Sequence, residues 1–111
     1  MEMRIMIKMN AEQFKEYIGY CNKPILVEFY APWCVYCRRL APIMEKVAEQ
    51  YADSLVIGQV NIDQEPALAD REQIEIVPTL VLYQNGTALG SIVAPDSKSA
   101  VETFLQETAG L

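Results

Sequence analysis

The feature that most constrains the fold of this chain is a nearly continuous apolar run, Pro24 to Tyr30, followed closely by a long helical pattern. Apolar side chains without alternation are typical of a strand that is buried on both faces of a sheet. From Cys34 to about Tyr51, apolar residues recur at the three- and four-residue spacing of a helix. A doubly covered strand that leads into a helix indicates an α/β fold.

The remaining segments continue this alternation. Asn10 and Ser97 are the predicted helix N-caps, Gln13 stands in the capping-box position, and Asn85-Gly86 indicates a hairpin turn. The order β-α-β-α-β-α-β-β-α predicts a mixed sheet with helices on both faces, and the length of 111 residues predicts one domain over residues 1–111. The predicted strands are Met3–Lys8 (at an edge), Pro24–Tyr30, Leu55–Asn61, Thr79–Tyr83 and Ala88–Val93, and the predicted helices are Ala11–Tyr20, Cys34–Tyr51, Glu65–Gln73 and Ser97–Thr108.

Two cysteines, Cys34 and Cys37, stand at the start of the second predicted helix. Residues three apart in a helix lie on the same face, with their Cα atoms within reach of a disulfide. The unpaired N–H groups and the dipole of the helix N-terminus favour the thiolate form of Cys34. A pair that opens and closes easily, with one member activated, is suited to exchanging disulfides with other proteins. The spacing after a strand therefore predicts a redox motif.

The charge balance excludes several classes of partner and chemistry. The formal net charge is −6, with nine Lys and Arg scattered along the chain, which argues against a nucleic acid or an anionic membrane as partner. The chain has no histidine, so the usual general base and the usual zinc-binding nitrogen are both absent. Any proton transfer must therefore fall to a carboxylate, a tyrosine or water.

The start of the sequence and the cysteine count favour a cytoplasmic protein. Residues 1–8 lack the architecture of a secretion signal, and no apolar run approaches the length that spans a membrane. Three cysteines are an odd number, and reducing conditions disfavour a structural disulfide framework. We expect Cys21, which lies outside the motif, to serve as a small apolar residue.

Taken together, these segments resemble the thioredoxin family over nearly the whole chain. Trp-Cys-x-x-Cys alone is a short motif, but on this strand and with these spaced companions it is highly specific. The resemblance implies a thioredoxin fold, with a central mixed five-stranded sheet flanked by about four helices. The matching segments are Ile25 to Cys34, Pro42 within the helix, Val60-Asn61-Ile62-Asp63, Val77-Pro78-Thr79-Leu80 and the Asn85-Gly86 hairpin.

The resemblance and the residues together assign roles to three side chains. Cys34 is expected to be the attacking thiolate and the more exposed sulfur, and Cys37 the resolving thiol. Glu28 lies in the middle of an apolar strand, where burial raises the pKa of a carboxyl and suits it to take a proton from Cys37 through a water. In the family this position holds the buried acid, and the lysine often placed near it corresponds to Gln59 here. The alternative is a solvated Glu28 at an edge.

The resemblance also identifies residues that would contact a substrate. Pro78 corresponds to a cis proline that faces the disulfide, and the backbone of Val77 would pair with an extended substrate segment. Trp33 would pack over the active site. The alternatives are an ordinary trans proline at the start of a strand and a tryptophan that only fills the core.

Two departures from the family pattern bear on specificity. The dipeptide between the cysteines is Val35-Tyr36, where general thioredoxins have Gly-Pro, and this dipeptide helps to set the redox potential in the family. Ile76 and Ala94 occupy positions where thioredoxins usually have glycines that line the docking surface. The potential, and the preference for substrates and for a reductase, therefore stay open at this stage.

The sequence predicts a monomeric protein-disulfide reductase that uses the Cys34–Cys37 pair without a bound cofactor or metal and is recycled by a thioredoxin-reductase-type donor. A first alternative is a more oxidising, oxidase- or isomerase-like protein. A second, from a different class, is a dimer in which Cys34 and Cys37 of two chains hold a metal or an iron–sulfur cluster. A third is a binding module that uses the fold without turnover.

Overall fold

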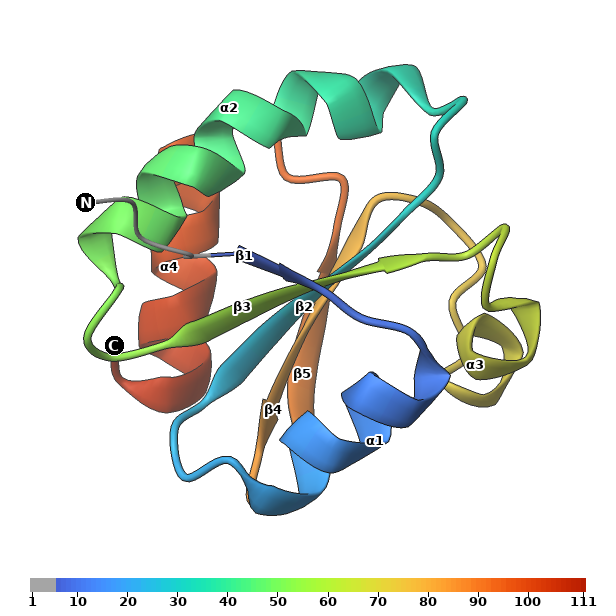
Figure 1. The fold of residues 1–111 in the computed structure, drawn as a ribbon. Coiled ribbons are helices and arrows are strands. Elements are labelled where there is room, and N and C mark those ends of the chain that lie inside the picture. The colour runs from blue at the N-terminus through green and yellow to red at the C-terminus, as the bar shows by residue number, and fades with distance from the viewer. Residues whose placement is uncertain (1–5) are drawn as a thin grey trace, which may run out of the picture.

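The structure, a computed structural model, describes residues 6–111 as five strands and four helices (Figure 1). The strands form one mixed sheet in the order β1-β3-β2-β4-β5. The strands are β1 (Met6–Lys8), β2 (Ile25–Tyr30), β3 (Val56–Asn61), β4 (Thr79–Gln84) and β5 (Thr87–Val93), and the helices are α1 (Ala11–Tyr20), α2 (Val35–Gln50), α3 (Pro66–Arg71) and α4 (Lys98–Ala109).

Strand β2 occupies the centre of the sheet. It pairs in parallel with β3, which in turn pairs in parallel with β1, and it pairs antiparallel with β4 on its other side. The hairpin of β4 and β5 completes the sheet and turns through Asn85 and Gly86, both with positive φ. Five consecutive residues of β2, Ile25 to Phe29, are buried, as expected for a strand covered on both faces.

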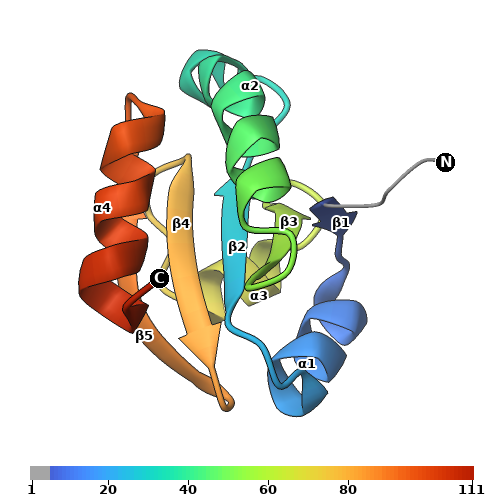
Figure 2. The same ribbon diagram turned by 90° about the vertical axis from the view of Figure 1, so that its left-hand side faces the viewer.

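Helices α2 and α4 cover one face of the sheet, and α1 and α3 lie on the other (Figure 1, Figure 2). Each face carries its own apolar cluster. Leu26 of β2 packs with Leu40 and Met44 of α2 and with Val101 of α4. The alternate residues of β2, among them Phe29, pack on the opposite face against side chains of α1 and α3. The period-two alternation of a strand thus separates the interior into two layers around β2.

Most predicted elements are confirmed to within one or two residues. The predicted helix over Glu65–Gln73 is too long, because the structure ends α3 at Arg71 and Gln73 has a φ of 61°, which no right-handed helix contains. The predicted first strand is confirmed for Met6–Lys8, and its first three residues lie outside the described residues. Within residues 6–111, none of the helices combines the length and apolarity needed to cross a bilayer.

The start of α1 has the predicted capping box. The Asn10 side chain accepts a hydrogen bond from the Gln13 backbone N–H at 2.8 Å, and the Gln13 side chain accepts one from the Asn10 N–H at 2.9 Å. Two backbone donors that the helix itself cannot satisfy are therefore paired.

Replacing this cap should destabilise the fold measurably. We expect Asn10→Ala to lower the free energy of unfolding by about 1 kcal/mol, because the Gln13 N–H loses its acceptor. Urea denaturation measures this change. Asn22→Ala, in the exposed loop after α1, is the matched control and should change the value by less than about 0.5 kcal/mol. A similar loss in both variants would contradict the role of the cap.

Candidate active site

Cys34 stands at the junction between the central strand and the longest helix, as the N-cap of α2. Its Sγ accepts a hydrogen bond from the Cys37 backbone N–H at 3.1 Å. Its position at the helix N-terminus adds the favourable end of the helix dipole. Cys34 Sγ therefore faces two groups, the Cys37 N–H and the helix dipole, that attract negative charge.

The expected difference in exposure between the two cysteines is wrong for this structure. Cys34 is 5% exposed and Cys37 is 6% exposed. Both pack with Ala31 in a small cluster that Ile62 and Val77 also contact. The loop that carries Val77 closes over Cys34, so position on the helix, and not exposure, distinguishes the two thiols.

The protonation of Cys37 is controlled by its surroundings. Burial raises the pKa of Cys37 to about 12, and a hydrogen bond with Cys34 and the negative charges of Cys34 and Glu28 act in the same direction, against a backbone hydrogen bond with Ala31. At neutral pH Cys37 is therefore a thiol, which is a poor nucleophile. A nearby base must take its proton before it can attack a disulfide.

Glu28 is buried, at 2% exposure, and its negative charge acts on Cys37. It and Cys37 line the same cavity of about 190 Å³. Burial raises the pKa of Glu28 above its ordinary value, and a hydrogen bond from Gln59 opposes this only in part. The Gln59 side chain donates to Glu28 Oε1 at 3.2 Å, from the residue directly across on β3. A neutral amide thus contacts the carboxyl where the family often has a lysine.

The loop before β4 completes the surroundings of Cys34. The peptide bond between Val77 and Pro78 is cis, as the sequence predicts. The Cys34 thiol donates to the Val77 carbonyl oxygen at 3.7 Å. Two segments far apart in the sequence therefore meet at the first sulfur, and the trans alternative for Pro78 is excluded.

Exposed apolar side chains surround the two cysteines. Trp33 is 64% exposed, which excludes the alternative that it only fills the core. Its Nε1 donates to Asp63 Oδ1 at 3.3 Å, which fixes the indole ring beside the motif. Val35 and Tyr36 are also exposed, and the Arg39 guanidinium carbon lies 5.5 Å from the centre of the Tyr36 ring. An apolar surface of this kind around a reactive pair is suited to contact with another protein.

Ile76 and Ala94, the two residues that stand where the family pattern has glycine, affect this apolar surface in different ways. Ile76 is 58% exposed and enlarges the apolar surface. Ala94 adopts a φ of 46°, the left-handed region that favours glycine, and its N–H donates to the Pro78 carbonyl oxygen at 2.8 Å. Ala94 therefore has the backbone conformation that a glycine would adopt and adds a methyl group to the surface.

Sequence reasoning missed two polar residues that the structure places beside Glu28. Tyr30 lines the cavity that Glu28 and Cys37 share, and Asn61 is the register partner of Tyr30 on β3. The signal was present in the sequence, because Tyr30 is two residues from Glu28 and must share its face of the strand. In the apolar run Pro24 to Tyr30, the aromatic ring of Tyr30 continues the apolar pattern, and its hydroxyl therefore does not stand out as a polar group.

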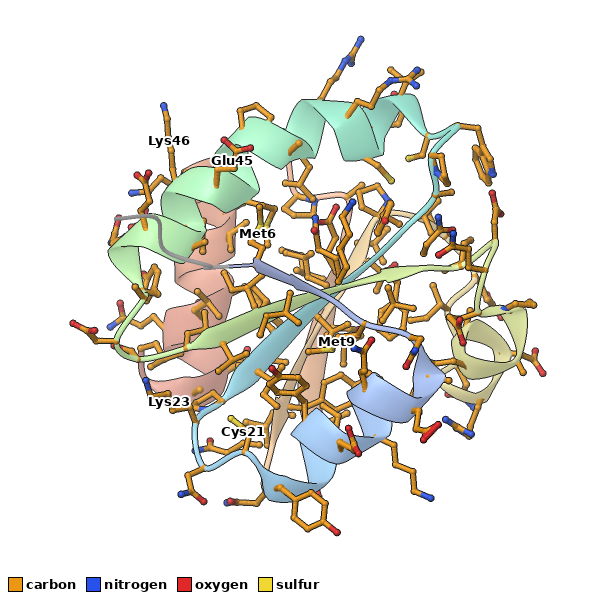
Figure 3. The ribbon with its side chains drawn as sticks, in the orientation of Figure 1. Met6, Met9, Cys21, Lys23, Glu45 and Lys46 are labelled. Carbon is orange, nitrogen blue, oxygen red and sulfur yellow. The ribbon has the colours of Figure 1, made fainter. Side chains whose placement is uncertain are left out.

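The third cysteine lies apart from this site. Cys21 follows α1, at the opposite end of the molecule from the first turn of α2 (Figure 3). It is half-buried and contacts the apolar cluster around Phe14, in keeping with a small apolar role. Among residues 6–111, no group of three or more His, Cys, Asp or Glu side chains gathers in a way that could hold a metal ion.

Comparisons with known proteins agree with this geometry. Residues 5–107 match the sequence model of the Thioredoxin family. A thioredoxin of Buchnera aphidicola from Baizongia pistaciae is 39% identical over 92 residues, which cover 83% of this chain and 84% of the relative. Thioredoxin 1 of Synechococcus elongatus is 33% identical over 85% of this chain and 88% of the relative. A thioredoxin of Buchnera aphidicola from Acyrthosiphon pisum is 33% identical over 95% and 97%.

The buried carboxyl makes stability depend on pH. The folded pKa of Glu28 is raised, so the protonated form favours the fold, and stability falls as pH rises from the unfolded pKa to above the folded one. We expect Glu28→Gln to raise the free energy of unfolding at pH 8 by about 1–3 kcal/mol, because the amide carries no charge into the interior. At pH 4 the difference should approach zero. Urea denaturation at the two pH values measures it.

The matched control for this experiment is Glu49→Gln on the exposed side of α2, which should leave stability nearly unchanged at both pH values. A Glu28→Gln protein less stable than the wild type at pH 8 would show that the charged carboxylate is well solvated in the fold.

Proposed function

Since this chain belongs to the thioredoxin family, we propose that Cys34 is the nucleophile of its reaction and Cys37 the resolving thiol. The protein is a thiol–disulfide oxidoreductase, as its thioredoxin relatives are. The observation that carries the assignment of roles is the hydrogen bond from the Cys37 N–H to Cys34 Sγ at 3.1 Å, at the N-terminus of α2. It stabilises a thiolate on the first sulfur, while burial keeps Cys37 protonated.

The proposed reaction runs in two exchanges. The Cys34 thiolate attacks one sulfur of a substrate disulfide, forms a mixed disulfide, and releases the other substrate sulfur as a thiolate. Cys37 then loses its proton and attacks Cys34 Sγ. The Cys34–Cys37 disulfide forms, and the second substrate thiolate leaves. Two electrons pass to the substrate, and the protein ends oxidised.

Glu28 is the base that we assign to the second exchange. Its raised pKa brings it closer to neutrality, where a carboxyl both accepts and returns a proton readily. It shares a cavity with Cys37, which leaves room for a bridging water. Gln59, as a neutral amide, does not hold the carboxyl in its charged form as a cation would.

We assign substrate contact to the surface around the motif. The Val77 carbonyl already accepts from Cys34 Sγ, so an extended substrate segment that pairs with the Val77 backbone would bring its own sulfur to the nucleophile. Pro78 fixes the direction of that backbone, and Trp33 and Tyr36 provide exposed apolar area on either side of Cys34.

The family implies protein disulfides as substrates and a reductase as electron donor. We propose that this protein works in the reducing direction, as a monomeric, single-domain, cytoplasmic protein, with the cysteine pair as its whole redox equipment and without a bound cofactor. The acidic net charge of −6 supports partners that are neither nucleic acids nor anionic membranes.

Single cysteine substitutions test the assigned roles. We expect Cys37→Ser to retain the first exchange and to accumulate mixed disulfides with protein substrates, because no thiol remains to resolve them. Cys34→Ser should lose insulin-disulfide reduction altogether. Gel electrophoresis without reductant detects the trapped species, and alkylation at neutral pH should label Cys34 well before Cys37. Equal labelling rates for the two thiols, or mixed disulfides on Cys37, would contradict the assignment.

The dipeptide of the motif should influence the redox potential. Tyr36 holds the Arg39 guanidinium over its ring, and this positive charge near the helix N-terminus favours thiolates and hence the reduced pair. We expect Val35-Tyr36→Gly-Pro to release the cation and to make the potential more reducing by about 10–20 mV.

Equilibration with glutathione measures this potential. Arg39→Gln removes the same charge without changing the dipeptide and should reproduce the direction of the shift. A potential unchanged in both variants would show that neither Tyr36 nor Arg39 tunes the pair.

A further inference from the structure

Polar side chains form a continuous row on two central strands beneath α2. Glu28 and Tyr30 are two residues apart on β2 and so share one face of the sheet. On β3, Gln59 is the register partner of Glu28, and Asn61 is the register partner of Tyr30. Four polar residues thus stand as two adjacent pairs in a region that is otherwise apolar.

The row leads from the interior towards the solvent. Glu28 is 2% exposed, whereas Tyr30, the last residue of β2, is only partly buried. Both line the cavity of about 190 Å³ that also contains Cys37. Tyr30 in addition packs against the cluster of the two cysteines. The Tyr30 side chain therefore lines the same cavity as the buried carboxyl and is at the same time partly accessible to solvent.

Tyr30 has the chemistry of a proton relay. A hydroxyl accepts one hydrogen bond while it donates another, so it can pass on a proton without becoming charged. Burial first, and then the negative charge of Glu28, raise the pKa of Tyr30, against a hydrogen bond from the Asn61 side chain. The phenol therefore keeps its proton. The side-chain oxygen of Asn61, Oδ1, already accepts from the backbone N–H groups of Asp63 and Gln64, which leaves the side-chain NH₂ group to donate to Tyr30.

The positively charged side chains around this cavity cannot act as a proton relay. Arg38 of α2 lines the cavity, and its Nη1 donates to the Pro32 carbonyl oxygen at 3.2 Å. Lys8 of β1 is the register partner of Gln59, and its side chain is exposed. Guanidinium and ammonium groups donate hydrogen bonds but accept none. Among the described residues that line this cavity, the groups able both to take and to give a proton are Glu28, Cys37 and Tyr30.

We propose that the Tyr30 hydroxyl is the relay through which the proton that Glu28 takes from Cys37 passes to solvent. The proposal rests on the roles proposed above for Cys34 and Cys37. As the Cys37 S–H bond breaks, the proton goes to the Glu28 carboxylate, the sulfur electron pair forms the bond to Cys34 Sγ, and the substrate sulfur leaves with the electrons of the broken disulfide. In the same step Tyr30 gives its proton to outside water and receives one from Glu28, which remains a carboxylate, so that the departure of the substrate sulfur is coupled to the relay.

The two exchanges can be followed separately with the aromatic disulfide DTNB. Attack by Cys34 releases a first coloured thiolate, and resolution by Cys37 releases a second. The released thiolate is stable without a proton, so the second phase reports the loss of the Cys37 proton. We expect Tyr30→Phe to slow the second phase about tenfold at pH 7 while the first phase stays within about twofold of the wild type. Imidazole, as an external proton carrier, should accelerate the second phase of the variant and leave the wild type unchanged.

Two further variants keep the test decisive. Tyr30→Trp keeps the aromatic bulk, but its indole N–H only donates, so it should show the same selective loss and the same recovery with imidazole. Tyr51→Phe removes a hydroxyl from a half-buried tyrosine at the far end of α2 and should change neither phase. A normal second phase in either Tyr30 variant, or an equal slowing of both phases without recovery by imidazole, would overturn the relay. Persistence of the first phase in Cys34→Ser would instead refute the proposed nucleophile, independently of Tyr30.

Discussion

The direct junction between a buried strand and a helix N-terminus is the constraint on which the rest of this structure depends. Strand β2 ends at Tyr30, and α2 begins at Val35, with Cys34 as its cap. A cap residue must supply an acceptor for the first backbone N–H groups of the helix, and here the acceptor is a sulfur. The same bond that caps the start of the helix is, in the proposed mechanism, the bond that favours a thiolate on Cys34. Capping of the helix and the proposed activation of the thiol thus depend on one hydrogen bond.

The second constraint is the position of this junction at the centre of the sheet. Because β2 is covered on both faces, the second cysteine and the residues beneath it are removed from water. Burial raises the pKa of both Cys37 and Glu28, so both protons are retained to higher pH than in water. Glu28 lowers the free energy of unfolding once it ionises. We propose that this carboxyl nevertheless stands here because the second exchange needs a group that takes a proton. In the proposed mechanism, stability and activity thus oppose each other at Glu28.

The surface around the two cysteines departs from the family pattern at several residues. Tyr36, Ile76 and Ala94 add apolar area where the family pattern has proline or glycine, while the backbone at Ala94 keeps the left-handed conformation of a glycine. Gln59 in place of a cation leaves the carboxyl beside it less charged. The two cysteines therefore stand where the family motif predicts them, and the departures from that motif lie on the apolar surface around them and beside Glu28.

The sequence by itself determined the elements, their order, the reactive pair and the buried acid. These follow from local rules: apolar periodicity gives strands and helices, capping residues give helix starts, and an acid within an apolar strand must be buried or paired. The sequence pattern extends α3 two residues too far, to Gln73, because nothing in the glutamine side chain indicates the positive φ that this residue adopts. The tertiary structure alone decided which distant segments meet. The closure of the Val77 loop over Cys34, the equal burial of the two cysteines and the pairing of Tyr30 with Asn61 all arise from contacts between separate strands and loops. Such contacts depend on register and packing in three dimensions, which no local pattern in the chain records.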